Sequence, residues 1–180
     1  MIKVIAICGK SGAGKDTLLK KLIPLFPDSA EIVSCTSRPP REGEINHINY
    51  HFIDREEFIN NKEQWVEFVE FNNWFYGTRF TDFKEDKINI GVFNPEGIEI
   101  LKKKNFKVIP IYVTVPDKIR LLRCLEREKN PNCAEICRRF ITDEHDFRTL
   151  DFDYIEFKNE DYLTNNKVKT LVKQIEDIIR

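Results

Sequence analysis

Short apolar runs alternate with amphipathic segments along most of this chain. Residues 4–8 and 108–115 are apolar and rich in β-branched side chains, which is typical of parallel strands buried on both faces. Residues 31–34 and 154–157 are two shorter candidate strands. Because these strands alternate with helical segments, the order predicts an α/β fold with a parallel sheet flanked by helices.

Four segments show the spacing of amphipathic helices. The first covers residues 15–23, the second begins at Asp117, and the fourth covers residues 168–179 at the end of the sequence. The third begins after Asn132, which has the N-cap to N3 spacing of a capping box with Glu135. Each apolar face predicts a helix that packs on the sheet.

Residues 35–87 interrupt this alternation and are rich in aromatic side chains. The segment lacks the long helical pattern that would connect two parallel strands. It therefore predicts a β-rich insertion with a small core of its own.

The composition fits one soluble domain. The 180 residues include 29 Lys and Arg against 30 Asp and Glu, and this balance disfavours nucleic-acid binding by bulk positive charge. No apolar run is long enough to cross a bilayer, and Met1–Val4 leave no room for a signal peptide. The five cysteines lack a disulfide spacing, so we expect reduced thiols and a cytoplasmic protein without nucleic-acid or membrane partners. The sequence does not set the oligomeric state.

A phosphate-binding loop joins the first strand to the first helix. Its pattern is G-x-x-x-x-G-K in the strand–loop–helix context that the motif requires. Glycines let the backbone wrap a phosphate, and the exposed N–H groups with the helix N-terminus attract its charge. We expect ATP to be bound by Gly9, Ser11, Gly12, Ala13, Gly14, Lys15, Asp16 and Thr17.

Asp16 departs from this motif, which asks for Ser or Thr after the lysine as a ligand of Mg²⁺. A carboxylate is also a hard oxygen ligand for Mg²⁺, although its charge beside phosphates is costly unless a metal lies between them. We therefore take Asp16 as the candidate metal ligand.

Two arginines, Arg38 and Arg41, flank a proline-stiffened turn in the insertion. They can form a bidentate clamp for an anion, to which the Tyr50 hydroxyl can add a neutral donor. On these residues alone, an exposed charged loop is an equally good interpretation.

The chain as a whole resembles the guanylate kinase family. The similarity covers nearly the whole length, and its Arg-Pro-Pro-Arg segment followed by Tyr-Gly-Thr is specific. The matching stretches, in the family's order, are 34–43, 50–52, 68–70, 76–78, 123–127, 138–139 and 153–154.

This resemblance implies a three-part architecture within a single domain of residues 1–180. The P-loop core comprises residues 1–33, 88–121 and 140–180. The insertion that binds the nucleoside monophosphate comprises residues 34–87, and a helical lid comprises residues 122–139.

The resemblance also implies roles for individual residues. Contacts to the acceptor phosphate fall on Arg38, Arg41, Tyr50 and Tyr76. Contacts to guanine fall on Ser34, Glu70, Thr78 and Asn94. Contacts to the transferring phosphoryl group fall on the catalytic residues Lys15, Arg127 and Arg139. The implied reaction is ATP- and Mg²⁺-dependent phosphorylation of GMP or dGMP.

The sequence departs from the family at two aspartates, whose places are taken by Val92 and Asn94. The first of those aspartates helps to organise Mg²⁺, so we hypothesise that Asp16 compensates for Val92. The second helps to hold guanine, and Asn94 can still accept from the guanine N2 amine through its side-chain carbonyl oxygen, in a bond about half as strong because it lacks charge assistance.

Other functions stay open at this point. The Gly-Lys-Asp-Thr end of the loop also resembles phage-encoded deoxynucleoside monophosphate kinases. Another deoxynucleoside monophosphate or a phosphorylated sugar is therefore an alternative acceptor. A non-catalytic phosphopeptide-binding module of the same fold is a further alternative, disfavoured because such modules lose the loop that Gly14 and Lys15 retain.

Overall fold

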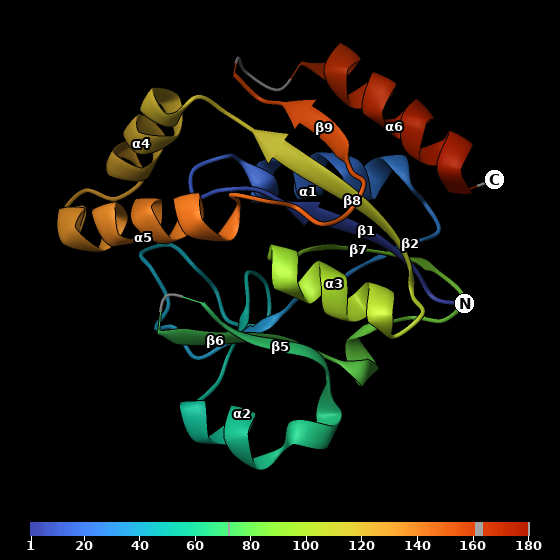
Figure 1. The fold of residues 1–180 in the computed structure, drawn as a ribbon, viewed down its shortest axis with the longest axis horizontal. Coiled ribbons are helices and arrows are strands. Elements are labelled where there is room, and N and C mark those ends of the chain that lie inside the picture. Colours follow the sequence, from blue (N-terminus) through green and yellow to red (C-terminus); the bar gives the residue numbers. More distant parts are fainter. Residues whose placement is uncertain (72, 161–163, 180) are drawn as a thin grey trace.

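The computed structural model describes residues 1–71, 73–160 and 164–179. A five-stranded parallel sheet in the order β2-β7-β1-β8-β9 forms its centre, with helices on both sides (Figure 1). These strands are β1 (Lys3–Cys8), β2 (Ser29–Glu31), β7 (Ile88–Val92), β8 (Lys107–Thr114) and β9 (Ile155–Lys158). The predicted α/β class with a parallel sheet is confirmed.

Side chains of β1 alternate between two cores, as expected for a central strand. Ile5 and Ile7 pack with apolar residues of α1 (Lys15–Leu22) and α6 (Asn165–Ile179). Val4, Ala6 and Cys8 face the other side and pack with residues of α3 (Pro95–Lys103). Because all five side chains are fully buried, the start of the phosphate loop is fixed to a rigid strand.

The second predicted strand is displaced. We expected residues 31–34, but β2 ends at Glu31. The Ile32 N–H still bonds to the Ile90 carbonyl at 2.8 Å, after which the chain leaves the sheet. Residues 33 and 34 cross to the second sheet, where Cys35 pairs with Gly77, and so they cannot extend β2.

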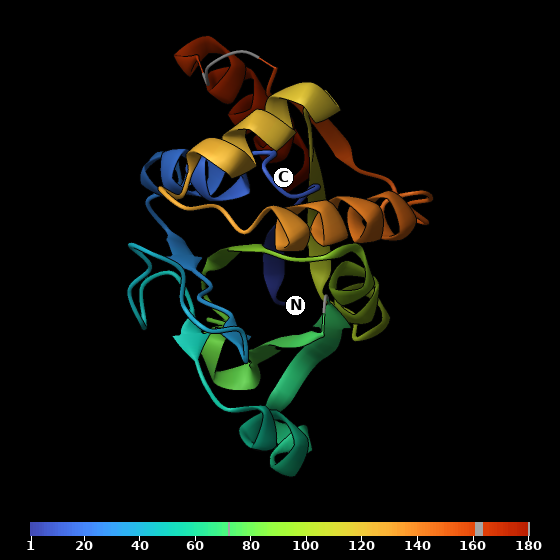
Figure 2. The same cartoon turned by 90° about the vertical axis from the view of Figure 1, so that its left-hand side faces the viewer.

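The insertion forms a second sheet in the order β4-β3-β6-β5. Its aromatic core contains Phe58, Trp65 and Phe75, so the predicted β-rich insertion with its own core is confirmed. Figure 2 shows this sheet below the central one, and a cavity lined by residues of both parts separates them. Its elements are β3 (Cys35–Thr36), β4 (His51–Phe52), α2 (Arg55–Asn60), β5 (Trp65–Phe71) and β6 (Trp74–Arg79).

Two helices, α4 (Asp117–Glu126) and α5 (Cys133–Asp146), flank the same space from the core side (Figure 2). The Asn132 side chain accepts the Glu135 N–H at 3.1 Å, which confirms the predicted N-cap. The proposed lid boundaries at residues 122 and 139 fall inside these helices, so the division into core and lid stays a prediction.

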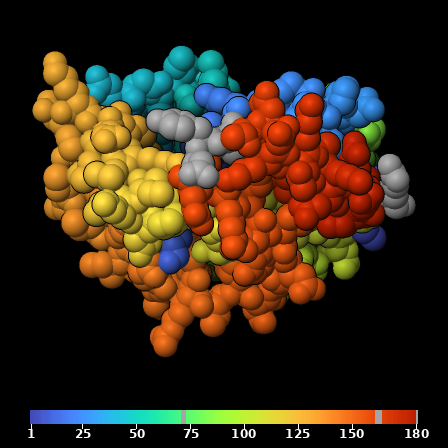
Figure 3. Space-filling model, turned by 90° about the horizontal axis from the view of Figure 1, so that it is seen from above, coloured from blue at the N-terminus to red at the C-terminus, as the bar shows by residue number. Residues whose placement is uncertain are grey.

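Three 3₁₀ helices complete the chain, at Ile23–Leu25, Lys62–Gln64 and Phe80–Asp82. Seen from above, α4 and the C-terminal part of the chain cover most of the visible face (Figure 3). Among the described residues, no helix is both long and apolar enough to span a membrane.

Candidate active site

A cavity of about 710 Å³ lies between the two sheets and the helices α4 and α5. Fifteen of the predicted site residues line it, and they come from the phosphate loop, the insertion, the end of β7 and the lid segment. These are Gly9, Ser11, Gly12, Gly14, Lys15, Asp16, Thr17, Ser34, Arg38, Arg41, Tyr50, Tyr76, Asn94, Arg127 and Arg139.

The phosphate loop has a backbone conformation that suits anion binding. Gly12 and Gly14 adopt φ of 78° and 91°, a left-handed region that disfavours other residues. The Lys15 ammonium donates to the carbonyls of Gly9 and Lys10 at 2.8 and 3.3 Å. Ala13 does not line the cavity: its methyl group packs in the core. The loop can therefore hold a polyphosphate, with Lys15 at its mouth.

Asp16 lies at the start of α1, exposed toward the cavity. Across residues 1–71, 73–160 and 164–179, no hydrogen bond or ion pair engages its carboxylate. Val92 lines the same cavity at the end of β7 and offers no oxygen ligand from its side chain. The donor set therefore fits a hard cation held from the loop rather than from the strand.

The arginine clamp of the insertion is buried and pre-formed. Arg38 is 4% exposed, and its Nη2 lies 2.9 Å from the Glu44 carboxylate, which also accepts the Arg41 N–H at 2.7 Å. The Arg38 Nε is buried without a partner among the described residues. A buried, unpaired N–H costs free energy, so this donor favours an anionic ligand.

Positive charge is crowded around Arg41. Burial, followed by the nearby charges of Arg38 and Arg127, lowers the pKa of Arg41. Burial also raises the pKa of Tyr50, with a contribution from Asp16, so its hydroxyl stays protonated as a donor. The rings of Tyr50 and Tyr76 meet edge to face, with centroids 6.0 Å apart. These groups form a site suited to a phosphate dianion.

Glu67 and Ser34 line a polar part of the cavity, the Glu67 pocket, whereas Thr78, an expected guanine contact, is fully buried and does not line it. The Thr78 hydroxyl donates to Glu67 Oε1 at 2.6 Å, and Ser34 Oγ lies 3.4 Å from Thr78 Oγ1. Glu67 is 5% exposed, and burial raises its pKa to about 7, although the hydrogen bond from Thr78 acts in the opposite direction. A ligand with adjacent N–H groups would stabilise this carboxylate in its charged form.

Glu70, the expected guanine contact, lies elsewhere. It is about half exposed and pairs with Arg55 at 3.2 Å, outside the cavity. Side chains alternate along β5, so Glu67, opposite Thr78, and Glu70, opposite Phe75, lie on different faces of the hairpin. The expectation that Glu70 lies in the site is therefore wrong, because Glu67 is the β5 carboxylate that lines the cavity.

Asn94 lines the cavity but its side-chain oxygen is engaged. This oxygen accepts the Gly97 N–H at 2.8 Å and so caps α3. A Cβ on Gly97 would lie 2.9 Å from Asn94 Oδ1 and 3.0 Å from Glu67 Oε2, which places the two side chains next to each other. The expected contact of this oxygen with a guanine amine is therefore wrong for this structure, because the oxygen faces the helix and the amide NH₂ is the group that Asn94 can offer to a ligand.

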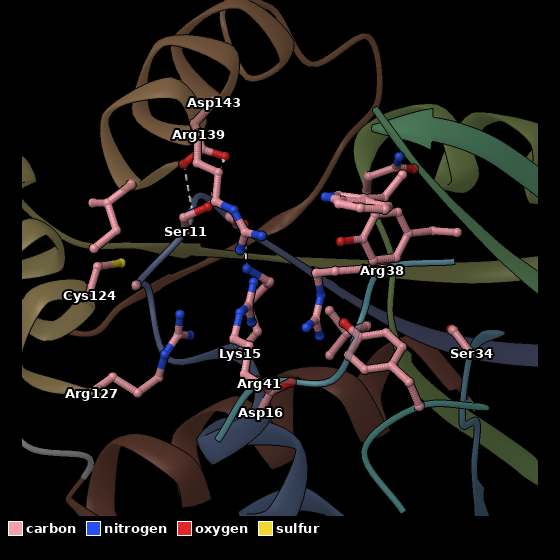
Figure 4. Close-up of a pocket in the computed structure, with 18 of the residues that line it drawn as sticks. Ser11, Lys15, Asp16, Ser34, Arg38, Arg41, Cys124, Arg127, Arg139 and Asp143 are labelled. Atoms are coloured by element: carbon pink, nitrogen blue, oxygen red, sulfur yellow. Dashed lines mark hydrogen bonds between the residues drawn. The ribbon is translucent and has the colours of Figure 1, made fainter. Parts of the chain in front are cut away.

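The two lid arginines reach the loop from different elements. Arg139 of α5 is held by Glu135, with Nε to Oε1 at 2.7 Å, whereas Arg127 follows α4 and is half exposed. Figure 4 shows both guanidinium groups directed toward the region of Lys15. With Arg123, five arginines and one lysine line the cavity, where they can neutralise several phosphate charges.

Sequence reasoning missed two polar residues that contact the phosphate loop. The Asn159 side-chain amide donates to the Ala13 carbonyl at 2.7 Å, and the Asn159 backbone carbonyl accepts from Arg123 at 3.1 Å. Asp143 of α5 accepts from the Ser11 N–H at 2.8 Å. These contacts to the loop join residues more than 100 positions apart, so no local pattern could have indicated them.

Comparison with known proteins gives one consistent result. The profile of the guanylate kinase family matches residues 1–180. A guanylate kinase of Campylobacter jejuni is 34% identical over 166 residues, which cover 87% of this chain and 81% of that protein. A guanylate kinase of Helicobacter pylori is 32% identical over 96% of this chain and 89% of its own length.

The fold comparison agrees with the sequence comparison. The crystal structure of guanylate kinase from Anaplasma phagocytophilum superposes with a TM-score of 0.63 at 21% identity, covering 99% of this chain and 85% of that one. The phosphate loop, the arginine clamp and the Glu67 pocket line one cavity. This chain belongs to the guanylate kinase family.

Proposed function

We propose that this protein transfers the terminal phosphoryl group of ATP to GMP or dGMP, giving ADP and the nucleoside diphosphate. The observation that carries the proposal is the convergence of the Lys15 loop, the Arg38 clamp and the Glu67 pocket on one cavity. The first suits a polyphosphate donor, the second a phosphate monoester, and the third a base with adjacent N–H groups.

The acceptor phosphate is held by Arg38 and Arg41, with hydroxyl donors from Tyr50 and Tyr76. Bidentate guanidinium contacts fix both the position and the orientation of its oxygens. Glu44 holds the two arginines in place before the acceptor arrives. This pre-organisation lowers the entropic cost of aligning the nucleophile.

Guanine is recognised by Glu67, which accepts from the base N1–H and N2–H. Ser34 lies beside this carboxylate and can donate to the base carbonyl at position 6. The buried Thr78 hydroxyl donates its one proton to Glu67 and so holds the carboxylate in place. Adenine lacks the N1 proton and carries a donor at position 6, so it would leave Glu67 and the Ser34 hydroxyl mispaired. Each such mismatch costs about 1–3 kcal/mol, which favours guanine by at least about a hundredfold for two of them.

In the transfer, an oxygen of the acceptor phosphate forms a bond to the γ-phosphorus of ATP. The bond from that phosphorus to the β–γ bridging oxygen breaks, and ADP leaves with the electron pair. The acceptor is already ionised, so no strong base is needed. Lys15, Arg127 and Arg139 stabilise the charge on the transferring group, and closure of α4 and α5 excludes water.

Magnesium is the implied metal, and Asp16 is its proposed ligand. The unengaged carboxylate of Asp16 beside the loop fits this role, and Val92 cannot fill it from the strand. When bound, Mg²⁺ supplies positive charge to the donor phosphates. Asp16 would then orient these phosphates from the start of α1. We also propose a cytoplasmic location, in keeping with five unpaired cysteines, two of them exposed.

The test is GDP formation from ATP and GMP by the purified protein and three variants. Lys15→Ala should abolish turnover, because the loop loses its cation, whereas Lys20→Ala, exposed on the same helix, should not change it. Arg41→Ala should raise the GMP KM and lower kcat together, since the acceptor loses both affinity and alignment. Folded wild-type protein that forms no GDP would refute the proposal.

A further inference from the structure

The buried carboxylate of Asp143 on α5 is hydrogen-bonded to the phosphate loop. Asp143 is 1% exposed. Its Oδ2 accepts the Ser11 N–H at 2.8 Å, and its Oδ1 accepts the Ser11 hydroxyl at 3.3 Å (Figure 4). One side chain thus binds both hydrogen-bond donors of a residue in the loop, and it does so from the helix that carries Arg139.

Asp143 is itself fixed by Arg120, which is 1% exposed on α4. Arg120 Nη1 donates to Asp143 Oδ2 at 3.1 Å, and its Nη2 donates to Glu144 at 2.8 Å. Its Nε donates to Asp117 at 2.7 Å, and its guanidinium lies 3.8 Å from the centre of the Phe140 ring. All three guanidinium nitrogens of Arg120 are hydrogen-bonded, so the Asp143 carboxylate that it holds has little freedom to move.

A buried ion pair of this kind contributes little net stability to a fold. Desolvation offsets most of the attraction, and packed apolar side chains in the same place are often as stable or more so. A directional contact differs from an apolar one because it sets distance and rotation. The arrangement is therefore better suited to fixing the geometry of Ser11 relative to α5 than to adding stability.

Arg139 lies four residues before Asp143 and so shares its face of α5, about 6 Å away along the helix axis. The contact from Asp143 to Ser11 sets the height and rotation of this face over the loop. The same contact therefore also sets the direction in which Arg139 points toward phosphates held by the loop.

We propose that Asp143 is a positioning residue for phosphoryl transfer: it ties Ser11 of the phosphate loop to α5 and thereby aims Arg139 at the transferring group. The inference rests on the proposed function, because it takes the phosphates in the loop as those of a donor nucleotide. Asp143 acts through Arg139 and does not touch the reacting atoms.

The first variant is Asp143→Asn, which keeps the side-chain volume. An amide oxygen can still accept one bond from Ser11, but the amide NH₂ must then face the donors of Arg120 or Ser11. We expect kcat to fall at least about tenfold, since a shift of about 1 Å in a catalytic group costs up to about a hundredfold. The GMP KM should stay within about twofold, because the acceptor clamp lies on the other sheet.

A double-mutant cycle with Arg139→Ala separates positioning from a purely structural role. If Asp143 acts through Arg139, Asp143→Asn should lower kcat by less than about twofold further once Arg139 is gone. Equal losses in both backgrounds would overturn the inference. Asp146→Asn, the same change three residues along α5, serves as the control and should leave kcat unchanged.

A further double variant tests whether the loss of kcat comes from misfolding or from the lost contact to Ser11. Arg120→Met combined with Asp143→Leu replaces the ion pair with apolar side chains and should retain the melting temperature. We expect kcat to stay at least about tenfold low, because Ser11 still lacks its acceptor. Wild-type kcat in this folded variant would refute the inference. Wild-type protein is assayed first, and its inactivity with GMP would refute the proposed function. If wild type is active but the effects of Asp143→Asn and Arg139→Ala on kcat are additive, only the role of Asp143 is refuted.

Discussion

Replacing Glu67 with glutamine tests which carboxylate recognises the base. The amide has nearly the same volume, and its oxygen can still accept the Thr78 hydroxyl that lies 2.6 Å from Glu67 Oε1. The charge is lost, however, and the NH₂ group takes the place of the second oxygen. Guanine would then present two N–H donors to a group that is itself a donor.

The size of the effect follows from the two bonds. Each hydrogen bond to a charged, buried acceptor contributes about 1.5–3 kcal/mol, so the loss of both amounts to about 3–6 kcal/mol. We therefore expect kcat/KM for GMP to fall by about 10²–10⁴-fold. The matched control is Glu70→Gln, which affects only an exposed pair with Arg55 and should change kcat/KM less than about fivefold.

The same variant should raise the stability of the fold above neutral pH. Burial raises the Glu67 pKa from 4.5 to about 7, so the folded state binds more protons than the unfolded state between these values. Stability therefore falls as pH rises through this window, by about 3 kcal/mol in total. Glutamine removes that loss, so Glu67→Gln should melt at a higher temperature than wild type at pH 8 and not at pH 4.

A coupled assay of ADP and GDP release, with melting curves on the same samples, provides both measurements. The reasoning is refuted if Glu70→Gln is the more damaging change. It is refuted equally if Glu67→Gln is inactive but less stable than wild type at pH 8, because that variant would then have lost its fold rather than its base contact.

Three further outcomes are expected. The GMP KM should rise about tenfold between pH 8 and pH 6, because guanine binds the charged form of Glu67, and this rise should be absent in Glu67→Gln. Asp16→Ser should weaken the dependence of turnover on Mg²⁺ concentration, and the double variant Asp16→Ser with Val92→Asp should restore it. An unchanged Mg²⁺ titration in the single variant would contradict the assignment of Asp16 as the metal ligand. Asn94→Asp puts a second carboxylate within about 6 Å of Glu67, so the midpoint of the KM profile should move to higher pH, and guanine selectivity at pH 9 should sharpen. An unmoved midpoint would contradict the placement of Asn94.

The phosphate loop and the N-cap of α5 could be predicted because their signals are local. Gly9 follows a buried strand directly and Lys15 opens the next helix, and Asn132 lies three residues before the N–H that it caps. The identity of the base-recognising carboxylate depends instead on strand register. Two glutamates three residues apart on β5 must face opposite ways, and a bulge between Trp65 and Glu67 shifts the pairing. Only the hairpin geometry decides between Glu67 and Glu70.

Long-range polar contacts were also beyond the sequence. Arg120 and Asp143 each look like exposed charges on amphipathic helices, since charged residues are rarely buried unless paired. Their burial arises because α4 packs on the loop so closely that a Cβ on Gly12 would lie 2.4 Å from the Arg120 carbonyl. Such a contact follows from the assembled fold and from no local pattern.

The central claim is that one cavity selects a guanine nucleotide and phosphorylates it. The most direct test compares kcat/KM for GMP, dGMP, AMP, dAMP, dTMP and dCMP, with ATP and Mg²⁺ in excess. We predict that GMP or dGMP is the best acceptor and exceeds AMP by at least about a hundredfold, from two mispaired polar groups in the Glu67 pocket. A best acceptor without guanine would contradict the account.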